Sequence, residues 1–244
     1  MNDIWILATA SLVASSCALV GVLLVLRRLS LLGDAISHSV LLGIVLAYLV
    51  MGERSEVAMM VGAVLMGLLT AGLTQLLQKN PHIQSDVSIG VVFTSFFALG
   101  VVLIAIYAGQ IDLDQECVLY GEIAFVPFDT VVWGEQSLGP RAFWLALAVF
   151  LINVVVIGVA FERFKLMAFH PLLALSLGLS VPFWHAMLMT LVSLTTVASF
   201  DAVGAILVVA LLVIPASSAY LVATSLKAMM GWALVYTQLS VLLG

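Results

Sequence analysis

The chain has 244 residues, of which 64% are hydrophobic and only 9% are charged, with a formal net charge of −5. Soluble domains are about half apolar and about a quarter charged, so the composition excludes an ordinary soluble fold and indicates a polytopic membrane protein. The chain has no basic patch interleaved with aromatic residues, so nucleic-acid binding is not expected. Its two cysteines, Cys17 and Cys117, form no CxxC motif, which excludes the usual cysteine-based metal and redox sites.

Eight apolar segments are close to the length of about 20 residues that a membrane-spanning helix needs. They cover residues 4–26, 34–51, 57–77, 88–108, 141–160, 183–200, 202–223 and 229–244. The first has no lysine or arginine before it and is longer than the apolar core of a signal peptide, which indicates a retained helix. The last is short and stops inside an apolar run, which leaves open a chain truncated at its C-terminus. The sequence predicts an all-α bundle of about eight transmembrane helices, with residues 1–244 forming a single transmembrane domain.

The distribution of charged residues predicts the orientation of the chain. With the N-terminus outside, six lysine or arginine residues fall on the cytoplasmic side, and only Arg54 and Arg141 fall outside. The six are Arg27, Arg28, Lys79, Arg163, Lys165 and Lys227. Acidic residues gather on the outer face, where they would either attract cations by their summed field or simply form solvated loops.

The second segment begins with two ionisable residues, Asp34 and His38, inside the run RRLSLLGDAISHSVLLGIVLAYL. Their spacing of four residues places both side chains on one face of a helix, within reach of a common ion. A carboxylate and an imidazole suit Zn²⁺, Mn²⁺ or Fe²⁺, with further ligands coming from elsewhere or from water. The alternative is a hydrogen bond that satisfies both groups. Ionisable groups inside a membrane are costly and usually mark ion or substrate paths, which favours metal or proton handling.

Two features of the sequence predict how the helices pack. Ala63, Gly67 and Ala71 recur every four residues, and such a face of small residues lets helices approach closely in lipid. Pro215, in the seventh segment, removes one helical hydrogen bond and is expected to kink or end that helix.

Two long connections interrupt the spans. The outer one, residues 109–141, mixes acidic and aromatic residues and is expected to form a short helix or a re-entrant piece over the pore. Glu122 within it is a candidate metal ligand where ions enter from outside. The inner one, residues 161–181, is amphipathic and is interrupted by Pro171 and Gly178. We expect it to lie on the membrane surface or to dock a cytoplasmic partner.

Two further polar residues fall close to predicted helix ends. Asp201 precedes the seventh helix at its outer end. Three roles are open for it: a third metal ligand, an outer gate or an N-cap of that helix. His185 lies near the cytoplasmic end of the sixth helix and is expected to be an interfacial anchor. The sequence contains no HExxH, GxSxG or GxxxxGK[ST] motif, so active transport would draw its energy from a gradient or from a separate ATPase subunit.

Three stretches of the chain resemble the bacterial ABC-3 metal permeases, the membrane subunits of manganese, zinc and iron importers. The Gly-Asp-Ala-x-Ser-His pattern of that family is met by Gly33, Asp34, Ala35, Ser37 and His38. The run SFDAVGAILVVALLVIPASSAYL resembles the second hallmark of the family, and ECVLYGEIAFVP resembles its outer region. The resemblance extends along nearly the whole chain.

This resemblance implies a multi-pass permease of the bacterial plasma (inner) membrane, similar to type II ABC importers. Two copies, identical or different, would enclose a pore, with a cytoplasmic ATP-binding subunit and an extracytoplasmic metal-binding protein as partners. Asp34 and His38 would coordinate the transported metal, and no cofactor would be bound permanently. The inner connection would dock the ATPase through a contact helix of Leu173, Ala174, Leu175, Ser176, Leu177 and Gly178. The chain departs from the family in having FHP where Phe-Asp-Pro is frequent.

Two other functions remain open at the level of sequence. A related permease for iron chelates or cobalamin would need room for a bulky ligand, and not an ionisable pair matched to one bare ion. An intramembrane enzyme would use Asp34 and His38 as an acid–base pair, but it leaves the docking-like inner connection without a role. The sequence does not decide among Mn²⁺, Zn²⁺ and Fe²⁺, because their ligand preferences overlap.

Overall fold

The fold is given by a computed structural model, which describes residues 2–52, 56–78, 80, 82–107, 123–128, 130–133 and 136–243. The first four helices are α1 (Asn2–Leu26), α2 (Ser30–Met51), α3 (Glu56–Gln78) and α4 (Ser85–Tyr107). The later elements are the 3₁₀ helix η1 (Ile123–Phe128), β1 (Thr130–Trp133), β2 (Gln136–Pro140), α6 (Arg141–Val159), α7 (Phe161–Phe169), α8 (Pro171–Ser176), α9 (Val181–Val222) and α10 (Leu226–Leu243). The described residues contain eight helical stretches long and apolar enough to cross a membrane, which confirms the eight predicted spans.

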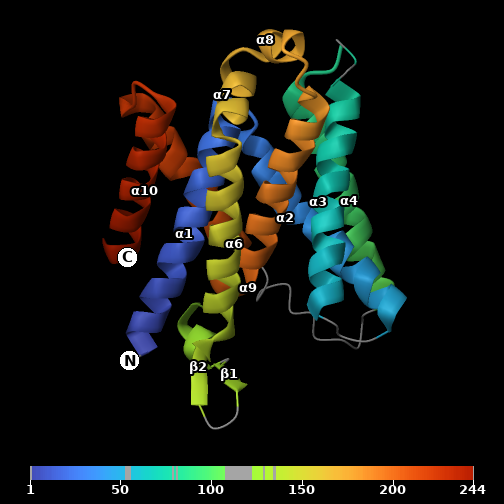
Figure 1. The fold of residues 1–244 in the computed structure, drawn as a ribbon. Helices are drawn as coiled ribbons and strands as arrows, with labels where there is room; N and C mark the ends of the chain where they lie inside the picture. The colour runs from blue at the N-terminus through green and yellow to red at the C-terminus, as the bar shows by residue number, and fades with distance from the viewer. Residues whose placement is uncertain are drawn as a thin grey trace.

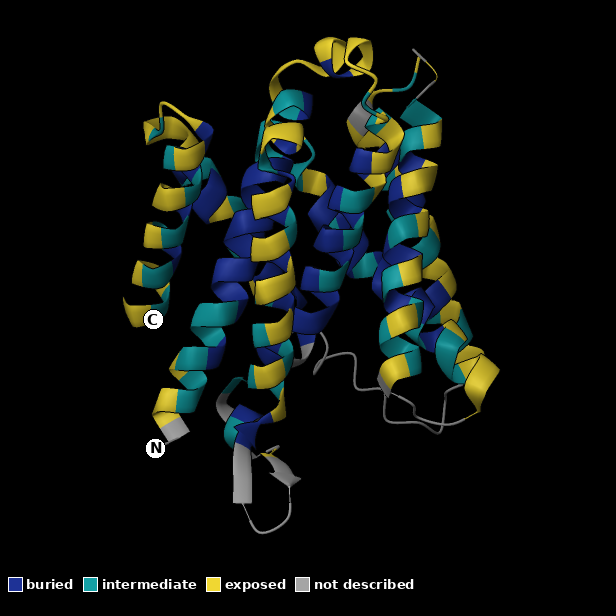
Figure 2. Cartoon of the chain, viewed as in Figure 1, coloured by how far each residue is buried: buried dark blue, intermediate teal, exposed yellow. Residues whose placement is uncertain are grey.

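The helices form two groups that meet at α9. In one group α1 packs against α6, α9 and α10, and in the other α2 packs against α3 and α4. The N-terminus and the β1–β2 hairpin lie at one end of the bundle, whereas α7 and α8 lie at the opposite end (Figure 1). Burial is concentrated along α1 and α9, while the outward faces of α3 and α4 carry exposed apolar side chains (Figure 2). Such faces suit contact with lipid or with another membrane subunit.

α9 consists of two limbs that run in opposite directions. A straight helix of 42 residues would be about 63 Å long, about twice the hydrocarbon thickness of a bilayer. Ser199 Oγ lies 3.9 Å from Cys17 Sγ, and the backbone of Leu212 is in close contact with Gly21. These two positions on α1 are only about 6 Å apart along its axis, so the chain must turn back between Ser199 and Leu212. The turn occurs at Gly204, whose backbone is non-helical with φ 75° and ψ 161°.

Three details of the predicted elements are corrected by the structure. α2 begins at Ser30 and not at residue 34, so Asp34 lies one turn inside the helix. Of the two outcomes predicted for Pro215, a kink or the end of the helix, the second is wrong, because α9 continues through Pro215 to Val222. The outer connection forms the expected short helix as η1, but the antiparallel hairpin of β1 and β2 was not predicted. Gly139 of this hairpin, with φ 97°, lies against the indole ring of Trp5 and so attaches the hairpin to α1.

Close helix contacts in the second group depend on glycine and alanine. The predicted small-residue face of α3 is confirmed, since Ala63 and Ala71 are buried and Gly67 lies against Ser193 of α9. Gly43 of α2 and Gly62 of α3 face each other so closely that a Cβ on either would collide with the carbonyl of the other. Close backbone approach of this kind provides the dispersion contacts that hold helices together where the surrounding solvent is itself apolar. It also places α2 firmly against its neighbours.

Candidate metal site

Asp34 and His38 lie together on the face of α2 that the bundle leaves open. His38 Nε2 is 3.5 Å from Asp34 Oδ1, which confirms that the two side chains share one face. The side chains are 42% exposed for Asp34 and 34% exposed for His38, although the helix that carries them is apolar enough to span a membrane. The two groups are therefore accessible to an ion, and they are not sealed in a core.

The opposite face of α2 explains why this pair points outward. Leu32, Ile36 and Val40 are buried, and Ser39 accepts a hydrogen bond of 2.7 Å from the Thr70 hydroxyl of α3. These residues fix the rotation of α2 about its own axis. Because a helix turns about 100° per residue, Asp34 and His38 then project away from the buried side.

Two phenylalanine rings of α4 pack against the His38 imidazole. The ring of Phe93 is stacked on it, with centroids 5.7 Å apart and an interplanar angle of 28°. The ring of Phe97 meets it edge to face, at 5.6 Å and 75°. Sequence reasoning missed both residues, because their spacing of four in an apolar helix is also what ordinary helix packing produces. No signal in the sequence relates them to His38.

The separation of the two polar atoms suits a shared metal ion. Ligand nitrogen and oxygen atoms lie about 2.1 Å from an ion such as Zn²⁺, so two of them at a tetrahedral angle are about 3.4 Å apart. The observed distance is 3.5 Å. Within the described part of the chain, no group of three or more histidine, cysteine, aspartate or glutamate side chains is suitably placed to hold an ion. A third ligand of these four residue types would therefore come from outside the described residues or from another subunit.

The other predicted ligands are only partly placed. Asp201 lies between the two limbs of α9, close to the turn at Gly204, and its side chain is outside the described residues. Glu122 also lies outside them. His185, expected to be an interfacial anchor, is only 8% exposed, so its side chain packs inside the bundle. Among the described residues its Nδ1 has no hydrogen-bond partner, and neither has Nη1 of Arg27, whose pKa is lowered by burial.

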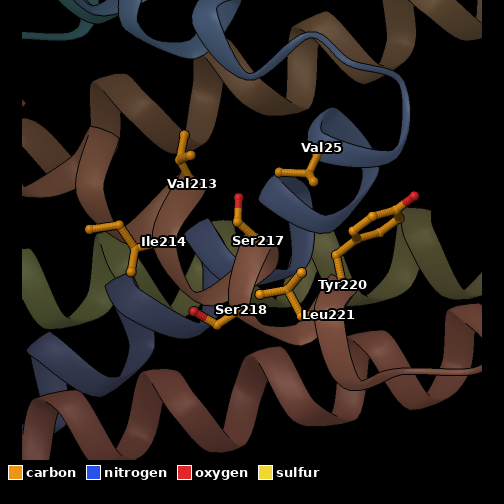
Figure 3. A pocket seen from close by; sticks show the side chains of 7 residues that line it. All are labelled: Val25, Val213, Ile214, Ser217, Ser218, Tyr220 and Leu221. Atoms are coloured by element: carbon orange, nitrogen blue, oxygen red, sulfur yellow. The ribbon is translucent and has the colours of Figure 1, made fainter.

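A pocket of about 400 Å³ lies between α1 and the second limb of α9 (Figure 3). Its lining consists of apolar side chains and three hydroxyl groups, namely Val25, Val213, Ile214, Ser217, Ser218, Tyr220 and Leu221. No carboxylate or imidazole is among these lining residues. Because transition metals in proteins prefer nitrogen, sulfur and charged oxygen ligands, this pocket does not compete with Asp34 and His38 as a metal site.

Comparison with known proteins agrees with the helical arrangement and with the sequence hallmarks. Residues 3–244 match the family described as the ABC 3 transport family. The chain belongs to this family. It is 49% identical to the manganese transport system membrane protein MntD of Bacillus subtilis, over 99% of this chain and 82% of the relative. It is 44% identical to the zinc transport system membrane protein TroD of Treponema pallidum, over 84% of this chain but only 56% of that relative.

Solved structures extend the likeness from sequence to fold. PsaBC from Streptococcus pneumoniae, solved in complex with Fab, matches with a TM-score of 0.78 and 33% identity, over 98% of this chain and 80% of that one. An inward-facing putative metal-chelate type ABC transporter matches with a TM-score of 0.65 and 18% identity, which shows a shared fold alone. As a member of the ABC 3 transport family with eight membrane-spanning stretches in its described residues, the chain is a multi-pass membrane protein.

The inner connection of this ABC 3 family member forms two short helices at the end of the bundle opposite the N-terminus (Figure 1). In α7, Phe164 and Met167 are buried while its charged residues are exposed, which agrees with the predicted amphipathic character. α8 carries exposed leucine side chains at Leu172, Leu173 and Leu175, and Leu177, which directly follows it, is exposed as well. Ala174, in contrast, is fully buried, so it anchors α8 to the bundle and is not available for contact with a partner. Gly178 follows with φ 76° and turns the chain toward α9.

Proposed function

We propose that this chain is the permease subunit of an ATP-driven importer of a divalent first-row metal ion, and that the ion passes Asp34 and His38. The observation that carries the proposal is an Asp–His pair with its polar atoms 3.5 Å apart, half-exposed on a helix of membrane-spanning length. Relatives named for manganese and zinc transport support Mn²⁺ or Zn²⁺ as the ion. A relative named for chelated iron transport, YfeD of Yersinia pestis, supports iron as a third candidate.

The exposure of this pair supports a second permease copy as partner. A carboxylate and an imidazole facing lipid would cost several kcal/mol, so in a membrane this face of α2 must meet water, an ion or protein. A second copy, identical or related, placed against α2 and α4 would cover the face and enclose a polar path between the two chains. It would also supply the ligands that the described residues lack.

The chemistry of the pair favours a transition metal over the alkaline-earth ions. Ca²⁺ and Mg²⁺ prefer shells made only of oxygen, whereas an imidazole nitrogen adds affinity for Mn²⁺, Fe²⁺ or Zn²⁺. In a permease for a bulky chelate, the iron is already coordinated by the chelator, so two protein ligands spaced for one bare ion would have no role. Metal transport therefore accounts for the site better than transport of iron chelates or cobalamin.

The energy for import would come from a separate cytoplasmic ATPase docked on α8. The exposed side chains of Leu173, Leu175 and Leu177 offer an apolar contact surface at the end of the bundle opposite the N-terminus. ATP-driven closure of the ATPase subunits would rock the helices and release the ion inward. An extracytoplasmic metal-binding protein would deliver it at the other end, so this chain would transport the ion without catalysing a reaction itself.

Uptake of metal into vesicles that contain the permease with its ATPase tests the proposal. We would compare the unaltered protein with Asp34→Asn and His38→Gln, using Mn²⁺, Zn²⁺ and Fe²⁺ as free ions and iron also as a chelate. His82→Gln, an exposed histidine at the inner end of the bundle, is the matched control. We expect both site variants to lose at least about tenfold in uptake while the ATPase still copurifies, since each removes a direct ligand. Normal uptake by both variants would show that the pair is only a structural hydrogen bond.

A further inference from the structure

Ring contacts, and not only the contact with Asp34, surround the His38 imidazole among the described residues. A metal-binding histidine usually donates its other ring N–H to a carboxylate or carbonyl group, and this bond fixes the orientation of the ring. Among the described residues, His38 has a polar side-chain contact with Asp34, between Nε2 and Oδ1 at 3.5 Å. Torsion about the bond to an imidazole ring is intrinsically broad, so packing against neighbouring side chains also determines where Nε2 points.

Phe93 and Phe97 supply that contact. One ring lies nearly parallel to the imidazole and the other meets it nearly at right angles, at 5.7 Å and 5.6 Å between centroids. Parallel and edge-to-face neighbours together leave few ring orientations free of collision. Both phenylalanines come from α4, so the orientation of a side chain on α2 depends on how α4 packs against it.

We propose that Phe93 and Phe97 are positioning residues that hold Nε2 of His38 toward Asp34 and thereby set the affinity and selectivity of the metal site. This inference rests on the proposed function. With the ring held, the site presents one nitrogen and one oxygen ligand at a fixed separation. With the ring free, Asp34 remains as the main ligand, and an oxygen-only site discriminates poorly against Ca²⁺ and Mg²⁺.

The test measures Mn²⁺ binding to the permease–ATPase complex in lipid nanodiscs, from the loss of the free-ion electron paramagnetic resonance signal. Phe93→Leu and Phe97→Leu are compared with Phe96→Leu, a matched control on the same helix. Because an aromatic contact of this kind is worth a modest free energy, we expect each of the first two variants to weaken Mn²⁺ binding about three- to tenfold. Competition by Ca²⁺ should become correspondingly stronger, and Phe93→Tyr, which keeps a ring, should restore affinity.

A double-mutant cycle separates positioning from a general loss of structure. In a His38→Gln background, Phe93→Leu should have no further effect on Mn²⁺ affinity, because the ring that it positions is gone. An equal loss in both backgrounds, or no loss in either, would overturn the inference while leaving the proposed function intact, provided that His38→Gln itself weakens binding. If His38→Gln binds Mn²⁺ as tightly as the unaltered protein, the proposed function fails and this inference fails with it.

Discussion

The contact between α2 and α3 gives a prediction whose size follows from the structure. A Cβ placed on Gly62 would lie 2.6 Å from the carbonyl oxygen of Gly43 and 2.8 Å from Cβ of Ala47. Ordinary contacts of this kind need about 3.4 Å or more, so Gly62→Ala forces the two helices apart by about 0.8 Å. Overpacking that displaces backbone typically costs about 1–3 kcal/mol.

Gly72, on the same helix, provides the matched control. A Cβ on Gly72 meets no atom within 4 Å, so Gly72→Ala changes helix propensity without any collision. Both variants gain the same intrinsic preference of alanine over glycine for a helix, which is up to about 1 kcal/mol in water. The propensity effect therefore cancels when the two are compared, and the difference between them reports the collision alone.

Unfolding of the purified permease in detergent, followed by circular dichroism as denaturant is added, measures both variants. We expect Gly62→Ala to be less stable than Gly72→Ala by about 1–3 kcal/mol. It should also bind metal more weakly, because the displaced helix is the one that carries the Asp–His pair. Equal stability of the two variants would refute the reasoning, since it would mean that α2 and α3 do not approach through Gly62.

Three further predictions concern other contacts of the bundle. Asn153 donates a buried hydrogen bond of 2.8 Å to Thr195. In the same unfolding assay, Asn153→Leu should destabilise the protein by about 1 kcal/mol, which is the range expected for hydrogen bonds between helices in membranes. A variant more stable than the unaltered protein would contradict this prediction. Leu175→Asp, on a side chain 56% exposed at α8, should abolish copurification of the ATPase and leave unfolding unchanged. Gly139 has φ 97° and lies against Trp5, so a Cβ at this position is both strained and in collision. Gly139→Ala should therefore speed limited proteolysis of the β1–β2 hairpin, and an unchanged cleavage rate would contradict the contact with Trp5.

Properties that depend on short stretches of chain were predictable. The eight spans follow from local hydrophobicity and length, and each span appears within a few residues of its predicted bounds. The common face of Asp34 and His38 follows from helical periodicity alone, because i and i+4 meet on any helix. The small-residue face of α3 was visible for the same reason. The start of α2 was misjudged by four residues, since the helix begins at Ser30 after Leu29 and the structure shows no side-chain cap there.

Features that depend on contacts between segments far apart in the sequence became visible only in the tertiary structure. The sequence by itself determined a membrane-spanning helical bundle with an ionisable pair on its second helix. The turn at Gly204, the burial of His185 and the contacts of Phe93 and Phe97 with His38 arise from packing between helices, which local patterns do not encode. An apolar helix looks the same in sequence whether it faces lipid, a neighbour or a metal ligand, because each of these surroundings accepts the same side chains.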